Sequence, residues 1–194
     1  MNFGLEREYF VGKANWNRES DQVFSKSWNC VGRVEALFSE DDSACFRAVQ
    51  IGDFDILLIR GEKGLIQAFH NVCRHRGTRL VSSECGPLKN ACVTCPYHAW
   101  TYNADGELIG APNMKEVDSF DPRQFGLKPV ACFDWCGFVM VNPGEAKANF
   151  EFDFAEIIER MKPWNLAQLE LKKTLAYEVK ANWKLVFQNY SECY

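Results

Sequence analysis

Two short stretches of the sequence, CRHRG at residues 73–77 and CPYHAW at residues 95–100, each place a histidine two or three residues after a cysteine. The whole chain has only three histidines, and two of them fall in these stretches. Each stretch reads as a tight loop beside a strand, so two hairpin tips can bring four side chains to one point. The four side chains are Cys73, His75, Cys95 and His98.

Ligand chemistry narrows what such a point can hold. Two thiolates and two imidazoles suit a tetrahedral zinc ion. They equally suit a 2Fe-2S cluster with the thiolates on one iron and the imidazoles on the other. The spacing of the ligands leaves both metals open.

The residues around the ligands resemble a known family. CRHRG and CPYHAW together resemble the Rieske signature of ring-hydroxylating oxygenases, which implies a Rieske 2Fe-2S cluster held by Cys73, His75, Cys95 and His98. Because neutral imidazoles replace two thiolates, such a cluster has a higher reduction potential than a four-cysteine ferredoxin, and it passes single electrons. Trp100 is expected to shield the cluster, with a plain core aromatic as the alternative.

The segment between the motifs departs from the family pattern. Nineteen residues separate His75 from Cys95, slightly more than is usual, and a longer surface loop is expected at residues 82–93. This segment supplies Cys92, which forms a Cys-x-x-Cys pair with Cys95. A zinc site completed by the first motif or by Cys85 is therefore the alternative, although zinc leaves CPYHAW unexplained. A strand cysteine is the simpler interpretation of Cys92.

Other residues near the motifs have plainer interpretations. His70 is expected to be a structural histidine, and four cysteines without a histidine partner are expected in the core. The arginines near the first motif are expected to pair with carboxylates, to dock a donor protein or to be solvated. The four cysteines are Cys30, Cys45, Cys132 and Cys136, and the arginines are Arg74, Arg76 and Arg79.

The remaining pattern predicts a mainly β chain. Short strand-like runs separated by turn signals are typical of an antiparallel meander, and Asp105-Gly106 suits a tight hairpin. A helix is expected at residues 20–28, capped by Ser20 or Asp21, and later helices at residues 154–161, ended by Pro163, and from Asn182 onward. The predicted strands are 44–51, 55–60, 65–72, 98–103, 107–110, 135–142 and 169–179.

By the resemblance, the fold is a Rieske-type antiparallel β-sandwich with cluster-binding hairpin loops. An N-terminal helix precedes it, and the first strand and helix of an α+β catalytic domain follow it. The expected domains are an N-terminal arm and helix at 1–29, the Rieske domain at 30–145, and the start of a truncated catalytic domain at 146–194.

The last segment, NWKLVFQNYSECY at residues 182–194, resembles the first helix of that catalytic domain in Rieske oxygenase large subunits. In the family this helix continues into histidine ligands of a mononuclear Fe(II), which the complete protein is expected to bind, whereas here the sequence stops at Tyr194. The chain is therefore interpreted as a fragment, inactive alone. By the same resemblance, Glu192 is expected to bridge electrons to His98 of a neighbouring subunit in a head-to-tail homotrimer, and Asn189 to lie near the iron.

Composition limits the partners. The net charge is −4 and no run of Lys and Arg is interleaved with aromatics, so nucleic acid is not expected. No signal peptide or membrane-spanning run is apparent, so a cytoplasmic location away from membranes is expected. Nine cysteines then read as thiols or metal ligands.

The first functional hypothesis is the electron-transfer portion of an oxygenase, which hydroxylates an organic substrate with O2 and electrons from a NAD(P)H-dependent reductase or a ferredoxin. The substrate is expected to be aromatic or a quaternary ammonium compound, and the ECY ending favours the choline and glycine-betaine branch. A stand-alone Rieske ferredoxin and a zinc-stabilised interaction module are the alternatives.

Overall fold

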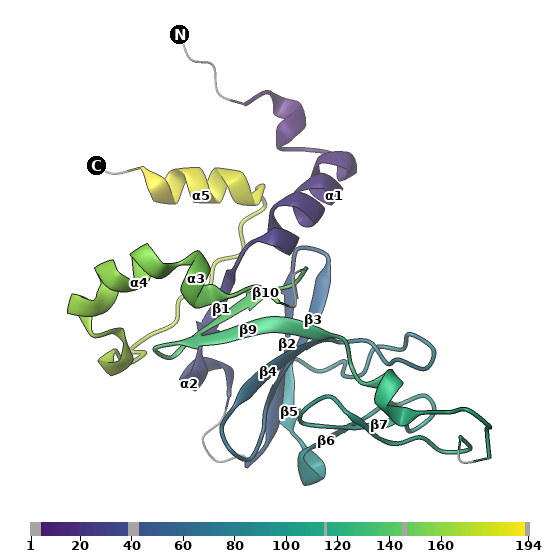
Figure 1. The fold of residues 1–194 in the computed structure, drawn as a ribbon. Coiled ribbons are helices and arrows are strands. Elements are labelled where there is room, and N and C mark those ends of the chain that lie inside the picture. Colours follow the sequence, from purple (N-terminus) through teal and green to yellow (C-terminus); the bar gives the residue numbers. More distant parts are fainter. Residues whose placement is uncertain (1–4, 39–42, 115, 145–146, 193–194) are drawn as a thin grey trace.

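The computed structural model describes residues 5–38, 43–114, 116–144 and 147–192, and its centre is a seven-stranded antiparallel sheet (Figure 1). The strand order is β1-β10-β9-β4-β3-β2-β5, and a second antiparallel sheet has the order β6-β7-β8. The mainly β prediction is therefore confirmed. The strands are β1 Asn29–Arg33, β2 Cys45–Ile51, β3 Phe54–Arg60, β4 Ile66–His70, β5 Cys85–Pro87, β6 Cys92–Thr94, β7 Thr101–Asn103, β8 Leu108–Gly110, β9 Pro129–Trp135 and β10 Phe138–Asn142.

Strand β3 shows why the large sheet forms the core. Its four central residues are 0% exposed, because alternate side chains enter two different clusters. Leu57 and Ile59 join a cluster that includes Tyr102 of the small sheet. Ile56 and Leu58 join a second cluster against β9 and β10. The first cluster thereby fixes the small sheet, and the loops it carries, against the large one.

Two hairpins depend on backbone with positive φ. Gly106 has φ +78°, and a Cβ there would lie 2.4 Å from the Phe69 ring, so the predicted turn after Asp105 requires glycine for two reasons. Strands β9 and β10 are joined by Cys136 and Gly137, with φ +53° and +89°, as in a type I′ turn.

The expectation of core positions for four cysteines is half wrong. Cys45 is buried and Cys132 is half-buried, whereas Cys30 and Cys136 are exposed. Cys136 occupies the hairpin tip, and Cys30 lies on the edge strand β1. The apolar character of cysteine therefore does not predict which of these four side chains are buried.

The N-terminal helix lies earlier than predicted. Helix α1 spans Lys13–Gln22 and is followed by the 3-10 turn η2, Phe24–Lys26, whereas residues 20–28 were expected to be helical. Ser20 does not cap a helix; it lies within α1, where its hydroxyl accepts a hydrogen bond from the Asp53 amide at 2.9 Å. This tertiary contact fixes the position of the helix, and sequence periodicity does not report it.

The other helices are short. The helix predicted before Pro163 is confirmed, and so is the Asn182 cap, whose side chain accepts from the Lys184 amide at 3.0 Å. They are α2 Val34–Leu37, α3 Phe150–Asp153, α4 Ala155–Met161 and α5 Trp183–Ser191, with 3-10 turns η1 Arg7–Tyr9, η3 Lys89–Ala91, η4 Pro122–Phe125, η5 Lys162–Trp164 and η6 Leu166–Gln168.

Two segments differ from the predicted loop and strand. Residues 82–93, expected as a surface loop, contain β5, which pairs with β2, and the start of β6. These strands have three residues each, too few to show alternation. Residues 169–179, expected as a strand, carry neither helix nor strand and form a long open trace between η6 and α5 (Figure 1).

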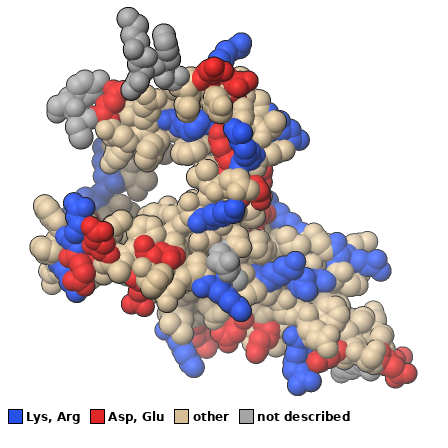
Figure 2. Space-filling view, turned by 45° about the horizontal axis from the view of Figure 1, so that its top comes forward, with Lys and Arg blue, Asp and Glu red and all other residues tan. Residues whose placement is uncertain are grey.

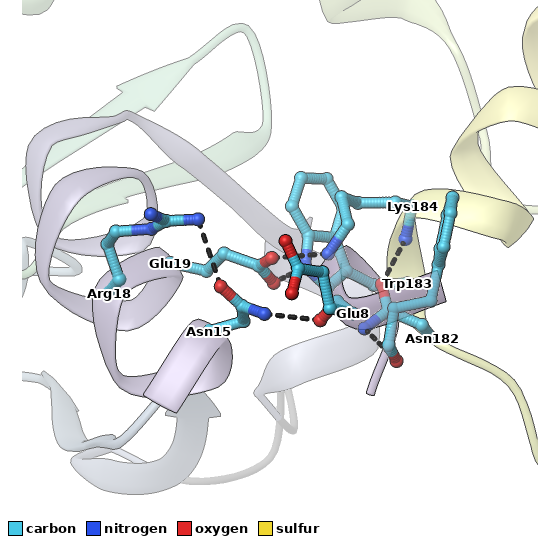
Figure 3. Close-up of polar contacts among 8 residues, drawn as sticks. Glu8, Asn15, Arg18, Glu19, Asn182, Trp183 and Lys184 are labelled. Carbon is cyan, nitrogen blue, oxygen red and sulfur yellow. Dashed lines mark hydrogen bonds and ion pairs between the residues drawn. The ribbon is translucent and has the colours of Figure 1, made fainter. Parts of the chain in front are cut away.

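Helices α1 and α5 meet through a polar contact (Figure 3). The Glu19 carboxylate accepts from the Trp183 indole at 2.8 Å and pairs with Lys184, and the Asn182 amide donates to the Phe10 carbonyl at 3.1 Å. Burial acts to raise the pKa of Glu19, but hydrogen bonds from Lys184 and Trp183 and the lysine's charge outweigh it and hold that pKa below its ordinary value. The beginning and end of the described chain are therefore joined.

Candidate metal centre

The first loop, residues 73–78, follows β4 and carries the first cysteine and histidine. The Cys73 amide donates to the Thr78 carbonyl at 2.8 Å, and the Cys73 carbonyl accepts from the Gly77 amide at 3.1 Å. Gly77 has φ +71°, which closes the loop. A bridge between Val72 and Arg79 lies at its base.

The second loop, residues 95–100, has the same hydrogen bonds. The Cys95 amide donates to the Trp100 carbonyl at 2.8 Å, and the Cys95 carbonyl accepts from the Ala99 amide at 3.1 Å. Ala99 has φ +56° and takes the place of the glycine. The second loop links β6 to β7. Both loops are therefore hairpin tips, as the motifs predicted.

A buried asparagine, which the sequence analysis missed, holds the base of the first loop. Asn71 is 0% exposed, and its side chain donates to the Val81 carbonyl at 2.9 Å and accepts from the Val81 amide at 3.1 Å. It also donates to Asp55, which pairs with Arg79. A polar residue at the end of an apolar strand is the signal that could have identified it.

The two cysteines are deeply buried and lie together. Cys73 is 2% exposed and Cys95 is 3% exposed, and both belong to the same buried cluster. Burial raises the pKa of the Cys73 thiol, and Cys95 contributes to this effect. The Tyr102 hydroxyl lies 3.3 Å from the Cys73 sulfur and accepts from the Arg74 amide at 3.1 Å.

Tyr102 is the second residue that the sequence analysis missed. Tyr102 follows Trp100 by two residues, so in an extended strand both side chains point to the same, inward face. This spacing is the signal that could have identified Tyr102. Burial raises the pKa of Tyr102 above its ordinary range, and the hydrogen bond with Cys73 adds to this. The hydroxyl therefore keeps its proton and can donate to a thiolate at position 73.

The two imidazoles form a second pair. The ring centroids of His75 and His98 are 4.6 Å apart, and His75 stacks on the indole of Trp100 at 4.7 Å and 8°. Trp100 is 2% exposed, so it is both a core aromatic and the wall behind His75. His98 is exposed, with the Tyr97 ring 3.7 Å away.

One buried atom indicates that this pair is built for a ligand. Nδ1 of His75 is buried and has no hydrogen-bond partner, an arrangement that costs free energy unless something binds there. Burial lowers the pKa of His75, with His98 and Arg76 adding to the effect. The ring is therefore neutral near pH 7, the form that ligates iron.

The arrangement fits a two-iron cluster better than a zinc ion. A structural zinc site gathers four ligands about one point, whereas a Rieske cluster takes two ligands on each iron. Within the described ranges, no three His, Cys, Asp or Glu side chains gather as they would around one ion. The Cys92 thiol donates to the Asn90 carbonyl at 3.0 Å, and Cys85 is exposed on β5, so neither completes a zinc site.

The remaining predicted residues lie apart from the two pairs or at their edge. Glu192 follows α5, which Figure 1 places at the other end of the fold from β6 and β7, so it does not meet His98 within one chain. His70 ends β4 with its ring tilted against Phe54. Asn189 is exposed on α5. The arginines differ: Arg79 pairs with Asp55, Arg76 is exposed, and Arg74 has a buried Nε without a hydrogen-bond partner.

Comparison with known proteins agrees with this geometry. Residues 27–121 match the family model of the Rieske [2Fe-2S] domain. Two hairpin tips with paired sulfurs and paired imidazoles are what such a domain needs. This part of the chain is therefore a Rieske iron–sulfur domain, and the family resemblance seen in the motifs is confirmed.

The chain as a whole is homologous to Rieske oxygenase subunits. The carnitine monooxygenase oxygenase subunit of Acinetobacter pittii is 36% identical over 96% of this chain and 49% of that protein. The glycine betaine monooxygenase oxygenase subunit of Pseudomonas aeruginosa is 34% identical over 99% of this chain and 43% of that protein.

Solved structures give the same family. The quaternary ammonium Rieske monooxygenase CntA in complex with gamma-butyrobetaine is 33% identical, with a TM-score of 0.81 over 95% of this chain and 52% of that chain. Naphthalene 1,2-dioxygenase with indole bound is 27% identical, with a TM-score of 0.64 over 76% of this chain and 33% of that chain.

The chain spans about half the length of the curated relatives it matches. Among the helices that the structure describes, none has the length and apolar character needed to cross a bilayer.

Proposed function

We propose that this chain is the electron-transfer portion of an oxygenase that hydroxylates a quaternary ammonium compound, with a 2Fe-2S cluster held by Cys73, His75, Cys95 and His98. The single observation that carries the ligand assignment is the paired arrangement: two buried thiols together, and two imidazoles together with an unpartnered nitrogen. When bound, such a cluster accepts and donates one electron at a time.

The residues around the ligands have distinct tasks. Asn71 holds the base of the first loop and so orients Cys73 and His75. Tyr102 donates a hydrogen bond to the Cys73 sulfur, which favours the more negative, reduced state. Trp100 packs on His75 and excludes water from that side, whereas exposed His98 leaves a side open to an electron partner.

The oxygenase assignment rests on how far the similarity extends. The relatives align over 96% and 99% of this chain, including α5, which lies outside the residues matched to the Rieske domain. A stand-alone Rieske ferredoxin would not need these residues. We therefore retain the division at residues 29 and 145 as our proposal, with residues 146–194 beginning a catalytic domain.

Partners follow from the same proposal. The two relatives are named oxygenase subunits, so we propose an NAD(P)H-dependent reductase or a ferredoxin as the electron donor. In the complete protein we propose a mononuclear Fe(II) and a homotrimer, in which Glu192 of one subunit lies beside His98 of the next. Helix α5, which Glu192 follows, lies at the other end of the fold from β6 and β7, so in this proposal a neighbouring subunit brings the two residues together. We also propose a cytoplasmic location for the complete protein.

The test is spectroscopic. Purified chain should be red-brown, contain equal amounts of iron and acid-labile sulfide, and give a Rieske-type EPR signal on reduction. Colourless protein with one zinc per chain would contradict the cluster. In the complete protein, Glu192→Gln should slow electron transfer from the cluster to the mononuclear iron and leave the EPR signal of the cluster unchanged. Glu62→Gln, the exposed-surface control, should change neither the transfer rate nor the EPR signal.

A further inference from the structure

One carboxylate ties the chain on both sides of the first ligand loop to strand β3. Before the loop, the Asn71 side chain donates to the Asp55 carboxylate at 3.1 Å, and the Asn71 amide donates to the Asp55 carbonyl at 2.9 Å. After the loop, the Arg79 guanidinium meets both carboxylate oxygens, with Nε 2.6 Å from Oδ2 and Nη2 3.3 Å from Oδ1. Such charge-assisted contacts are stronger than neutral hydrogen bonds, and the planar guanidinium adds a fixed direction.

The two partners of this carboxylate stand next to the ligands. Asn71 is 0% exposed, and one residue separates it from Cys73. A bridge joins Val72 to Arg79 across the base of the loop. The Cys73 amide donates at 2.8 Å to the carbonyl of Thr78, which directly precedes the arginine. A shift of Asn71 or Arg79 therefore moves the backbone that carries Cys73.

Strand β3 also sets the place of the second ligand loop. Side chains two apart on a strand point to the same face, so Asp55 lies on the face of Leu57 and Ile59. These two apolar side chains are buried in the cluster that contains Tyr102, two residues beyond the second loop. One face of one strand thus aligns both loops, the first through an ion pair and the second through apolar packing.

We propose that Asp55 is a positioning residue for the cluster, which sets where Cys73 and His75 stand relative to the second loop. Its side chain is 27% exposed and acts on the ligands only through Asn71 and Arg79. The identity of the cluster rests on the proposed function. Every contact that carries the inference lies within the part of the chain that matches the Rieske domain.

Charge and position predict different results for the ion pair. A pure charge effect would raise the reduction potential in Asp55→Asn, which leaves the arginine unpaired, and lower it in Arg79→Gln, which leaves the carboxylate unpaired. Figure 2 shows charges of both signs interspersed on the face it draws, so a shift can be attributed to the altered pair. A position effect releases the same loop in both variants, and both should change the EPR g values of the cluster in the same way.

The first measurement is the EPR spectrum and the rate of iron loss to a chelator in the cluster-loaded chain. Asp55→Asn, Arg79→Gln and the double variant should all have altered g values and lose iron about tenfold faster than the wild type. The double variant restores the net charge but not the ion pair. Arg79→Lys, which keeps the charge, should recover part of the wild-type iron retention.

A matched control makes the same chemical change two residues earlier. The Asp53 carboxylate accepts from the Trp16 indole at 2.7 Å and so holds α1 in place of a ligand loop. Asp53→Asn should therefore leave the g values and the rate of iron loss at their wild-type values.

Hydrogen exchange of the purified chain tests the same contact whatever metal is bound. Asp55→Asn should speed exchange of residues 71–81 about tenfold and leave that of residues 92–103 unchanged. The proposal is overturned if this variant keeps the wild-type EPR spectrum, iron loss and exchange. It is equally overturned if the double variant regains the wild-type spectrum, since charge would then be the cause, or if Asp53→Asn changes the g values as much. A wild type without iron would contradict the proposed function, and exchange would still decide whether Asp55 holds the loop.

Discussion

The two ligand loops have the same backbone and different surroundings. Each closes with an amide-to-carbonyl bond of 2.8 Å across its ends and a residue of positive φ, Gly77 in the first loop and Ala99 in the second. Yet His75 in the first is packed on an indole, whereas His98 in the second is exposed. Backbone hydrogen bonds thus fix where the ligands stand, and the side chains around them decide which ligand meets water.

The largest expected effect comes from removing either thiol. Cys73→Ser and Cys95→Ser should each lose the cluster, because both sulfurs are equally buried and equally necessary. Iron and sulfide should fall to near zero, and the thermal unfolding temperature should fall as well, since metal binding couples to folding. Cys136→Ser, at an exposed hairpin tip, is the control. Retention of the cluster in only one of the ligand variants would break the equivalence of the loops.

Replacing an imidazole is expected to have the next largest effect. His75→Cys or His98→Cys adds a negative thiolate, which should lower the reduction potential by on the order of 100 mV or more, or lose the cluster. Protein-film voltammetry measures the shift. His70→Cys, outside the loops, should leave the potential near that of the wild type, and an unchanged potential in both ligand variants would refute the assignment.

The positive-φ residues test the shared backbone directly. A Cβ at Gly77 would touch nothing within 4 Å, so Gly77→Ala should cost only backbone strain, about 1–2 kcal/mol in the free energy of unfolding. Ala99→Gly should relieve the same strain and stabilise the protein by up to about 1 kcal/mol, less the added entropy of the unfolded chain. Urea unfolding measures both, and changes of the same sign would show that the loops are not equivalent.

The smallest effect concerns the Tyr102 hydroxyl, which lies on β7 and contacts the cysteine of the first loop. Tyr102→Phe removes a donor to the Cys73 sulfur and should lower the reduction potential. A differential of about 1 kcal/mol corresponds to about 40 mV for one electron. Tyr97→Phe, on the exposed side of the second loop, is the matched control. A shift that is equal in the two variants would place the effect outside the hydrogen bond.

The motifs and most long strands could be predicted from the sequence, because they depend on local features. Only three histidines are present, and strands such as β2 and β3 are seven-residue runs rich in apolar residues and bounded by turn signals. Strands β5 and β6 have three residues each and show no period, so they were missed. The roles of Asn71 and Tyr102 depend on partners distant in sequence, which no local pattern reveals.

The contact between α1 and α5 has a consequence for the order of folding. Glu19 is 165 residues from Lys184 along the chain. Such non-local contacts close late, since the loop entropy must be overcome first. During synthesis, α1 can contact Asp53 once the turn between β2 and β3 has formed, whereas its contact with α5 must wait until nearly the whole described chain has left the ribosome. The first helix to be made therefore gains its last contact only when synthesis of the described chain is almost complete.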